Sequence, residues 1–276
     1  MEITDIIKEA FIFPSTDLAK LAIYIALSFV SVLLSILGLV LFALGLVDNG
    51  VYAVIGAVLF IAGLIVGFIL SGYLMSILKS GIDGDENVPE FKWKENLITG
   101  IKYLIVNIVY FIIPAIIVLI VGWITNLYGL SASVFTKMMT ASMNAPANAT
   151  VAITDVIPQS TFASLGTAML ITGVVALLLF LIFLFIETMG QSRLANTDSL
   201  GDALNVVEAF KDIGRIGWGK VIAVVVLIFI IIAAINAIIS GLNYYITGIS
   251  IISIVVSPYL IFFASRATGL LYSDIA

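Results

Sequence analysis

Six apolar stretches of membrane-crossing length dominate the 276-residue sequence. A transmembrane helix needs about 20 mostly apolar residues, because each residue advances the helix by about 1.5 Å and the hydrocarbon core is about 30 Å thick. We therefore predict an all-α, polytopic integral membrane protein, built as a bundle of six transmembrane helices with short amphipathic helices at the interface. The predicted spans are 20–46, 51–79, 101–127, 165–189, 218–242 and 246–271.

The composition agrees with a membrane protein and excludes several kinds of chemistry. Hydrophobic residues make up 62% of the chain and charged residues 11%, whereas soluble domains have roughly 45–50% and about 25%. The chain has no histidine and no cysteine, which excludes disulfides, thiol nucleophiles, Cys/His zinc sites and Ser-His-Asp triads. An acidic loop, Asp83–Asn87, begins like a calcium-binding EF-hand, but Val88 and Lys94 replace the required glycine and glutamate. We predict no enzymatic activity, no cofactor and no metal.

Lysine and arginine are distributed unevenly between the two sets of loops. Ten lie in the N-terminal segment or in and beside the loops at about 80–100 and 190–217, against Lys137 alone in the loop at about 128–164. Because short loops rich in Lys and Arg stay in the cytoplasm, we predict cytoplasmic N- and C-termini. The chain is then one membrane domain over residues 1–276, a multi-pass protein of the cell membrane. The excess of 17 acidic over 12 basic residues argues against a nucleic-acid partner.

The loop at about 128–164 is the long extracytoplasmic connection in this topology. It contains the sequon Asn148-Ala149-Thr150, so Asn148 is a candidate glycosylation site. Four further residues recur at helical spacing and predict a helix that rests on the membrane surface. They are Phe135, Met138, Met139 and Met143.

Two segments on the predicted cytoplasmic side have the periodicity of surface helices. In the first, apolar residues recur at helical spacing from Ile3 to Phe11, and Pro14 ends the pattern. In the second, Ser199 and Asp202 have the spacing of a capping box. An apolar stripe at Leu200, Ala203, Leu204, Val207 and Phe210 follows, opposed by Asn205, Glu208 and Asp212. This second helix either lies on the membrane or docks a partner.

Polar residues inside spans are costly and usually functional. Glu187 and Arg266 have similar predicted depths, so they either pair or extend separately to the cytoplasmic interface. Asn107 and Asn236 lie deeper, where hydrogen bonds between helices explain them without a substrate. A further set of small residues predicts a helix-packing face on the second span. These residues are Gly56, Gly63, Gly67 and Ser71.

Part of the second surface helix resembles the first half of the coupling motif of ATP-binding-cassette importer permeases. The matching residues are Glu208, Ala209 and, after Phe210 and three further residues, Gly214. The expected second half is absent, because the stretch that contains Val224 has no leucine-proline pair. The resemblance implies an alternative function as a transport subunit, in which residues 199–215 dock an ATPase partner.

A wider resemblance covers most of the chain. Several segments together are similar to the multi-pass membrane proteins, common in archaea, of the domain-of-unknown-function family four thousand and thirteen. The segments are Val88–Trp93, Leu97–Lys102, Tyr110–Pro114, Leu200–Ala203 through Trp218, and Ala264–Gly269. The resemblance implies a compact six-helix membrane protein without assigned activity, and it supplies no catalytic residues. We therefore expect a non-enzymatic interaction or membrane-organising component, whose partners are the lipid bilayer and other membrane proteins or further copies of the chain.

Overall fold

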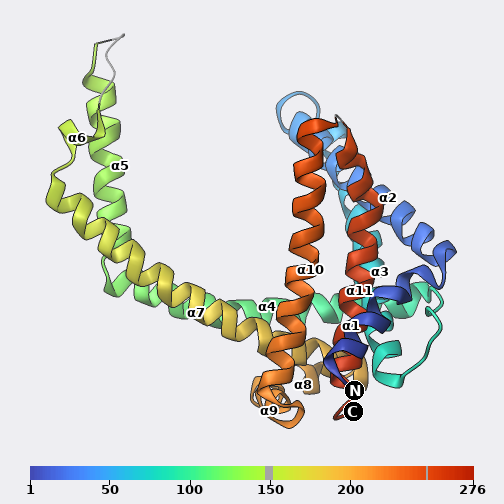
Figure 1. Cartoon of the computed structure of the whole chain (residues 1–276). Coiled ribbons are helices and arrows are strands. Elements are labelled where there is room, and N and C mark those ends of the chain that lie inside the picture. Colours follow the sequence, from blue (N-terminus) through green and yellow to red (C-terminus); the bar gives the residue numbers. More distant parts are fainter. Residues whose placement is uncertain (147–151, 247) are drawn as a thin grey trace. The chain divides into compact units, whose positions relative to one another are not determined.

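A computed structural model describes residues 1–146, 152–246 and 248–276 (Figure 1). This part of the chain is helical and contains no strand. It forms two compact units: a first unit of Met1–Ile108 and Phe185–Ala276, and a second unit of Val109–Leu184. The elements are α1 (Ile3–Ile12), η1 (Phe13–Ser15), α2 (Leu18–Val47), α3 (Gly50–Asp83), α4 (Trp93–Ile124), α5 (Leu127–Asn144), α6 (Ile153–Val156), α7 (Gln159–Thr197), α8 (Leu200–Ala203), α9 (Val206–Ile216), α10 (Trp218–Tyr245), η2 (Ile249–Ile252) and α11 (Ser253–Tyr272).

Within the described residues, six helices are long and apolar enough to cross a membrane: α2, α3, α4, α7, α10 and α11. This confirms the predicted all-α, six-span class. Most of the helices continue beyond the apolar run into polar sequence, so helical structure extends into the predicted loops at 80–100 and 190–217. The largest extensions are in α4, which begins at Trp93, and in α7, which covers Gln159–Thr197.

Single residues with left-handed backbone conformation mark where several of these helices end. Gly84 has a φ of 69° and caps α3, Asn126 has a φ of 56° between α4 and α5, and Asp198 has a φ of 53° after α7. Most residues rarely adopt this backbone conformation. Glycine does so readily, and asparagine and aspartate do so more often than other residues. The sixth span also begins later than predicted, at Ser253, because Gly248 (φ 89°) and the 3-10 helix η2 precede it.

The helices α2 and α3 form a tight hairpin in the first unit. The Asn49 side chain accepts a 3.0 Å hydrogen bond from the backbone N–H of Val51 and so caps α3. Glycines allow the two backbones to approach: a Cβ at Gly45 would lie 2.0 Å from the Ala53 nitrogen. Such small-residue contacts are how membrane helices gain packing energy without a hydrophobic driving force.

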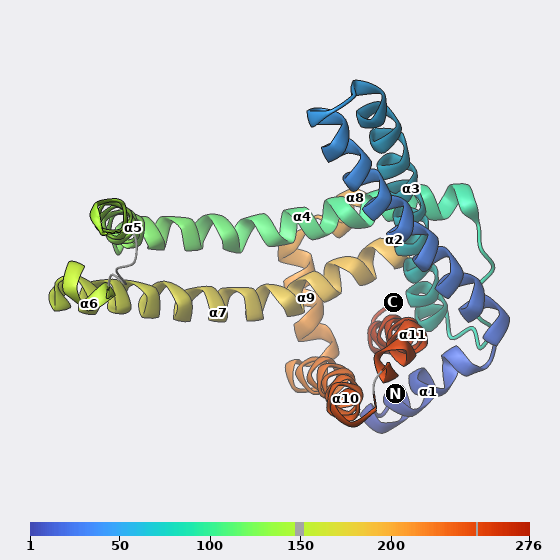
Figure 2. The ribbon, with the colours of Figure 1, turned by 90° about the horizontal axis from the view of Figure 1, so that it is seen from above.

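The last helix, α11, is the centre of the first unit. It contacts α1, α2, α3 and α10, and Figure 2 shows it end-on among these elements. Half of its candidate span is buried, against less than a fifth in the other five spans. Its closest approach is to α3, where a Cβ at Gly269 would lie 2.1 Å from the Leu78 carbonyl oxygen. The two backbones therefore touch at this crossing.

An aromatic and aliphatic cluster fills the space between α2, α3 and α11. Tyr24 packs edge-on against Phe262 with ring centroids 4.9 Å apart, and Tyr73 lies beside both rings. The N-terminal helix α1 is folded onto this unit, because Ile6 and Ala10 are completely buried. The amphipathic helix predicted from Ile3 to Phe11 is therefore present, and part of its apolar face is covered by protein.

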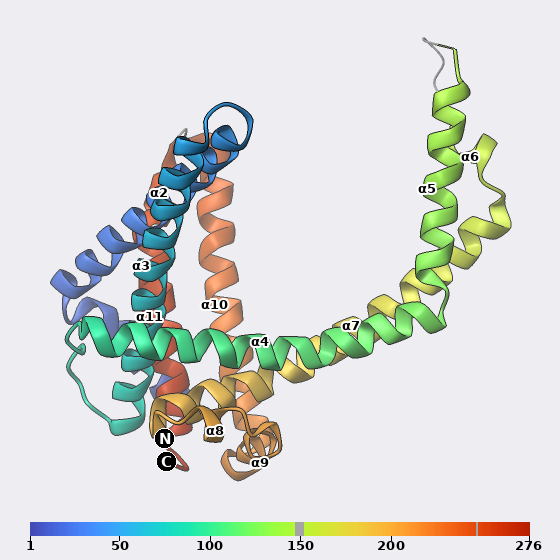
Figure 3. The ribbon, with the colours of Figure 1, turned by 180° about the vertical axis from the view of Figure 1, so that it is seen from behind.

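The second unit is a pair of antiparallel helices with α5 and α6 at their connection. Within this unit α4 and α7 run side by side (Figure 3). The Thr125 and Thr172 hydroxyl groups lie 3.2 Å apart, and the Phe111 and Phe180 rings lie 5.2 Å apart. The helix α5 covers the predicted surface-helix residues, but it buries none of its own side chains.

Candidate functional site

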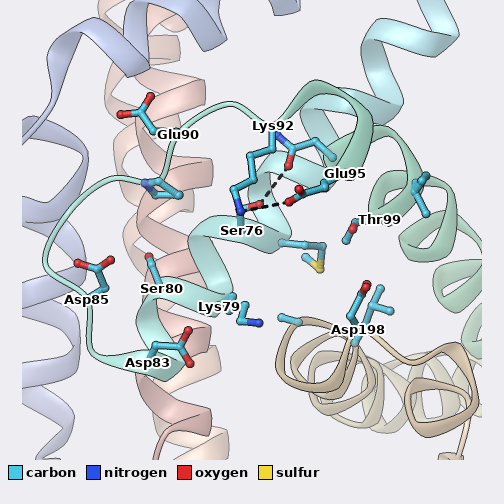
Figure 4. A pocket seen from close by; sticks show the side chains of 16 residues that line it. Ser76, Lys79, Ser80, Asp83, Asp85, Glu90, Lys92, Glu95, Thr99 and Asp198 are labelled. Carbon is cyan, nitrogen blue, oxygen red and sulfur yellow. Dashed lines mark hydrogen bonds and ion pairs between the residues drawn. The ribbon is translucent and has the colours of Figure 1, made fainter.

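A polar cavity of about 470 Å³ opens in the first unit (Figure 4). It is bounded by the last turns of α3, the loop after them, the first turns of α4 and the end of α7. The close view shows Ser76, Lys79, Thr99 and Asp198 around the opening. Its size lies within the range of about 300–1,000 Å³ typical of small-molecule sites.

The cavity wall contains a buried amide that is only partly satisfied. Asn96 is 2% exposed, and its Oδ1 accepts a hydrogen bond from the Ser76 hydroxyl at 3.2 Å. The Asn96 Nδ2 is buried and has no hydrogen-bond partner within the described parts of the chain. The backbones of α3 and α4 touch here, because a Cβ at Gly72 would lie 1.8 Å from the Asn96 carbonyl oxygen. An unsatisfied buried polar group costs about 1–3 kcal/mol, so this amide requires an explanation.

Several carboxylates at the cavity have protein partners. Glu95 pairs with Lys92 at 3.2 Å. Asp198 pairs with Lys102 of α4 at 2.8 Å. Asp85, in the loop, accepts hydrogen bonds from the backbone N–H and the side-chain amide of Asn87, which lower the pKa of Asp85.

Two charged residues of the cavity wall remain unmatched. Lys79 and Asp83, which both lie on the last turns of α3, have neither an ion pair nor a side-chain hydrogen bond among the described residues. Glu90, in contrast, pairs with Lys20 of α2 at 2.8 Å. The two groups without any polar partner are thus one cation and one anion, and Asp85 is a further anion that has neutral partners only.

The loop between α3 and α4 is held firmly against the first unit. The Phe91 ring stacks on Tyr73, with ring centroids 3.7 Å apart, and the Tyr73 hydroxyl donates to the Pro89 carbonyl at 2.9 Å. Lys20 donates to the Val88 carbonyl at 2.6 Å. The segment Val88–Trp93, which contributed to the family resemblance, therefore has a structural role as one wall of the cavity.

A second polar cluster surrounds Arg266, which is 1% exposed. Its guanidinium donates to the Glu9 carboxylate at 2.6 Å, to the Ser80 hydroxyl at 3.1 Å and to the Asp85 carbonyl at 2.6 Å. It also lies over the Phe13 ring, 4.5 Å from the centroid. The predicted pairing of Arg266 with Glu187 is therefore wrong, because Glu9 of α1 is the ion-pair partner.

A third cluster surrounds Asp212, which sequence analysis had placed on the polar face of a surface helix. Asp212 is 1% exposed and contacts Arg193 at 2.8 Å, Arg215 at 2.6 Å and the Tyr272 hydroxyl at 3.0 Å. The prediction was wrong because the helix is not continuous: α8 ends at Ala203, and α9 begins at Val206. The interruption changes the helical phase, so Asp212 turns inward.

The caps of these two short helices explain the interruption. Ser199 accepts a hydrogen bond from the backbone N–H of Asp202, as the capping box predicted. Asn205 then accepts from the backbone N–H of Glu208 and starts a second helix. A second N-cap residue so soon after the first favours two helices over one.

The candidate polar residues of the spans have separate roles. Asn107 accepts from Gln191 at 3.0 Å, and the same Gln191 amide donates to Glu187 at 3.1 Å, so α4 and α7 are joined here. Asn236 donates to the Ile232 carbonyl of its own helix at 2.9 Å. Among the residues that the structure describes, Asn236 makes no hydrogen bond to another helix, contrary to the expectation. Gln191 was missed, although it follows Glu187 by one helical turn.

The small residues of α3 lie along its crossing with α2. A Cβ at Gly56 would lie 2.3 Å from the Phe42 nitrogen, and one at Gly63 would lie 2.4 Å from the Ser35 hydroxyl. At Gly67 the corresponding distance, to the Ser31 hydroxyl, is 3.4 Å. The remaining member, Ser71, donates to the Gly67 carbonyl within its own helix.

The candidate docking residues of α9 differ in exposure. Ala209 is completely buried, and a Cβ at Gly214 would approach only Trp218, at 4.0 Å. Glu208 accepts from Lys211 at 2.7 Å and from Arg215 at 3.0 Å, and these contacts lower the pKa of Glu208. The candidate glycosylation site, Asn148, lies outside the described residues.

These arrangements define a class of protein. Six helices are long and apolar enough to cross a membrane, and among the residues that the structure describes no group of three or more acidic residues is placed to hold a metal ion. The class is that of polytopic α-helical membrane proteins. The family model described as "Protein of unknown function (DUF4013)" matches residues 55–244, and the chain belongs to this family.

The family match and the resemblance found in the sequence overlap in most of their segments. The match includes Val88–Trp93 and Leu200–Ala203, but it ends before Ala264–Gly269. No curated protein and no solved structure matches the chain. The functional argument therefore depends on the residues of this chain.

Proposed function

We propose that the protein is a non-enzymatic component of the cell membrane that acts by binding other membrane proteins. The observation that carries this proposal is the surface of α5. This helix has 18 residues, none of them buried. Phe135, Met139 and Met143 are 70%, 54% and 76% exposed. Their spacing of four residues places them on one face of the helix.

The exposed apolar residues of α5 indicate that another molecule contacts this helix. The helix α5 is not one of the six helices that are long and apolar enough to span a membrane, so its exposed apolar residues face either the membrane surface, as the sequence predicts, or a protein partner. Methionine side chains are flexible and polarizable, and they are common on surfaces that bind protein partners. Exposed apolar patches of this kind mark interaction sites. The stripe therefore supports a protein partner that binds on the side of α5.

The buried charges support a non-enzymatic role. Arg266 is bound to Glu9, and Asp212 is bound to two arginines and a tyrosine. Both clusters join helices that are distant in sequence, which is a structural use of charge. General acid or base catalysis instead needs a group within reach of a bound substrate.

A photo-crosslinking amino acid tests the interaction. It would replace Met139 in one variant and Lys137, which is exposed on the opposite side of α5, in the matched control. We expect a defined protein adduct, identified by mass spectrometry, from position 139 and little from position 137. Adducts to lipid alone, or equal adducts from both positions, would contradict the proposal.

The proposed orientation is testable because the chain has no cysteine of its own. Single substitutions Asp85→Cys, Asn148→Cys and Asn205→Cys would be exposed to an impermeant thiol reagent in sealed vesicles. With both termini cytoplasmic, residues 85 and 205 react from the inside and residue 148 from the outside. Reaction of 148 and 205 from the same side would refute this topology.

No contact in the described part of the chain favours the transport alternative. A docking helix must present its motif to the ATPase, whereas Ala209 is buried and Glu208 is bound to Lys211 and Arg215. Co-purification of an ATPase with the wild type, lost in Glu208→Ala with Gly214→Ala, would reverse this assessment.

A further inference from the structure

We propose that the cavity between α3, α4 and α7 binds a zwitterion in which a phosphodiester is joined to a primary ammonium group. This is the chemistry of glycerophosphoethanolamine, either free or as the headgroup of a phospholipid. The inference concerns the first unit only, and it does not depend on the proposed function of α5. Its basis is the set of polar groups that the protein leaves unmatched at one place.

The unmatched charges of the cavity are complementary to a zwitterion. Glu90, Glu95 and Asp198 are each paired with a lysine, at 2.8–3.2 Å. Asp85 is hydrogen-bonded by Asn87. Among the described residues, the charged groups of the cavity without any polar partner are therefore the ammonium group of Lys79 and the carboxylate of Asp83, while Asp85 contacts neutral donors only. A ligand with a single charge would leave one of them without a counter-charge, whereas a zwitterion matches both.

The spacing of the two residues favours a short zwitterion. Lys79 and Asp83 are four residues apart on α3, and side chains at this spacing lie on the same helix face with Cβ atoms about 5–6 Å apart. A phosphate and an ammonium group joined by two carbon atoms span a similar distance. In the close view the Lys79 side chain extends into the opening, towards Asp198 (Figure 4).

The buried amide of Asn96 is a second, independent sign of a ligand. Its Nδ2 is buried without a partner while Oδ1 is bound to Ser76. If the amide were turned, Nδ2 would donate to Ser76, and Oδ1 would lack a partner instead. A zwitterion satisfies either arrangement, because its phosphate accepts hydrogen bonds and its ammonium group donates them.

The position of the cavity also suits a headgroup. It lies along the last turns of one span-length helix and the first turns of another. Beside it, Trp93 and Ile98 at the start of α4 are exposed. Tryptophan is enriched where membrane helices meet the headgroup layer. A lipid headgroup at this level would reach the cavity without leaving the bilayer surface.

Calorimetry on the full chain in detergent tests the proposal, with glycerophosphoethanolamine as the probe. We expect saturable binding that weakens by about tenfold or more in Lys79→Met and in Asp83→Asn, since each substitution removes a charge-assisted hydrogen bond to the ligand. Both residues are exposed, so the variants should fold. The controls are Lys94→Met and Asp48→Asn, whose residues are exposed and do not line the cavity.

Related probes separate the two charges. Glycerol phosphate lacks the ammonium group, and glycerophosphocholine has a positive charge without N–H donors. We expect both to bind more weakly than glycerophosphoethanolamine, and Asp83→Asn to reduce this preference. Equal binding of the three compounds would overturn the proposal, and so would unchanged affinity in Lys79→Met and Asp83→Asn.

Native mass spectrometry separates the two sources. Full chain released from bilayers of equal phosphatidylethanolamine and phosphatidylcholine should retain phosphatidylethanolamine, and Lys79→Met should retain less, if the ligand is a lipid. Binding of only the soluble probe would assign the site to a free zwitterion. Binding of neither the soluble probe nor the lipid would refute the site.

Discussion

The two units of the chain use different means to hold their helices. In the first unit, buried charges join distant segments, and glycines bring α3 into backbone contact with α2, α4 and α11. In the second unit, the contacts between α4 and α7 include a pair of threonines and a pair of phenylalanines, and α5 buries nothing. The first unit therefore has a packed centre at α11, whereas in the second unit α5 has no buried residue along its whole length.

The strongest test of this difference removes a buried charge from the first unit. Asp212→Asn leaves Arg193 and Arg215 without their shared carboxylate, and breaking a buried ion pair costs about 3–5 kcal/mol. We expect the free energy of unfolding to fall by about this amount, as measured by circular dichroism during thermal or denaturant unfolding in detergent. A fall of less than about 1 kcal/mol, close to the median for surface pairs, would contradict a structural role.

Hydrogen exchange should show the difference without mutation. The helix α5 has no buried side chain, whereas Ala209 and Ile213 of α9 are completely buried. Because local opening needs less free energy where fewer contacts break, we expect α5 to exchange about a hundredfold faster than α9. Mass spectrometry of peptides from the two helices measures the rates. Equal protection in purified protein would mean that α5 is already covered.

A pair of glycine substitutions compares the two units directly. A Cβ at Gly72 would lie 1.8 Å from the Asn96 carbonyl, while one at Gly173 in the second unit would meet nothing within 4 Å. We expect Gly72→Ala to destabilise the protein by about 1–3 kcal/mol through overpacking. Gly173→Ala should be neutral or slightly stabilising, because alanine is the better helix former. Equal shifts in melting temperature would contradict the difference.

The smallest expected effect concerns Glu208, on the surface of the first unit. Hydrogen bonds from Lys211 and Arg215 lower its pKa below the ordinary value of 4.5. The stabilisation is therefore present above that value and is lost as the pH falls through the lowered pKa. In Glu208→Gln we expect a slightly lower melting temperature at about pH 7 and no difference at about pH 2, where the carboxyl is protonated. Glu2→Gln, at an exposed position in the N-terminal segment, is the control.

Much of the fold could be predicted from the sequence, because hydropathy is a local property that adds up along each span. Helix ends could not, since they depend on single residues such as Asn126 and Asp198 that adopt left-handed conformations. The helix α7 is an example: the predicted fourth span ended at residue 189, whereas the helix continues to Thr197. The apolar run ends before the helix does.

The polar sites were harder to predict, because their members are distant in sequence. Arg266 was noticed as an intramembrane charge, but its partner Glu9 is 257 residues away. Asp212 was assigned to the wrong face, because a break of two residues changes the phase of the helix after it. Asn96 gave no signal, since a single amide at the start of a span looks like ordinary interfacial sequence.

The lysines and arginines that indicated the topology have a second use in the folded protein. Eight of the 12, including Lys20, Lys102 and Lys220, form ion pairs with carboxylates of the same chain. A polybasic surface attracts anionic lipids through unneutralised charge, and that attraction is screened by salt. Here the neutralisation is internal, so the folded protein should not concentrate anionic lipids around itself. The same cations can guide insertion while the chain is unpaired and act as internal counterions once it has folded.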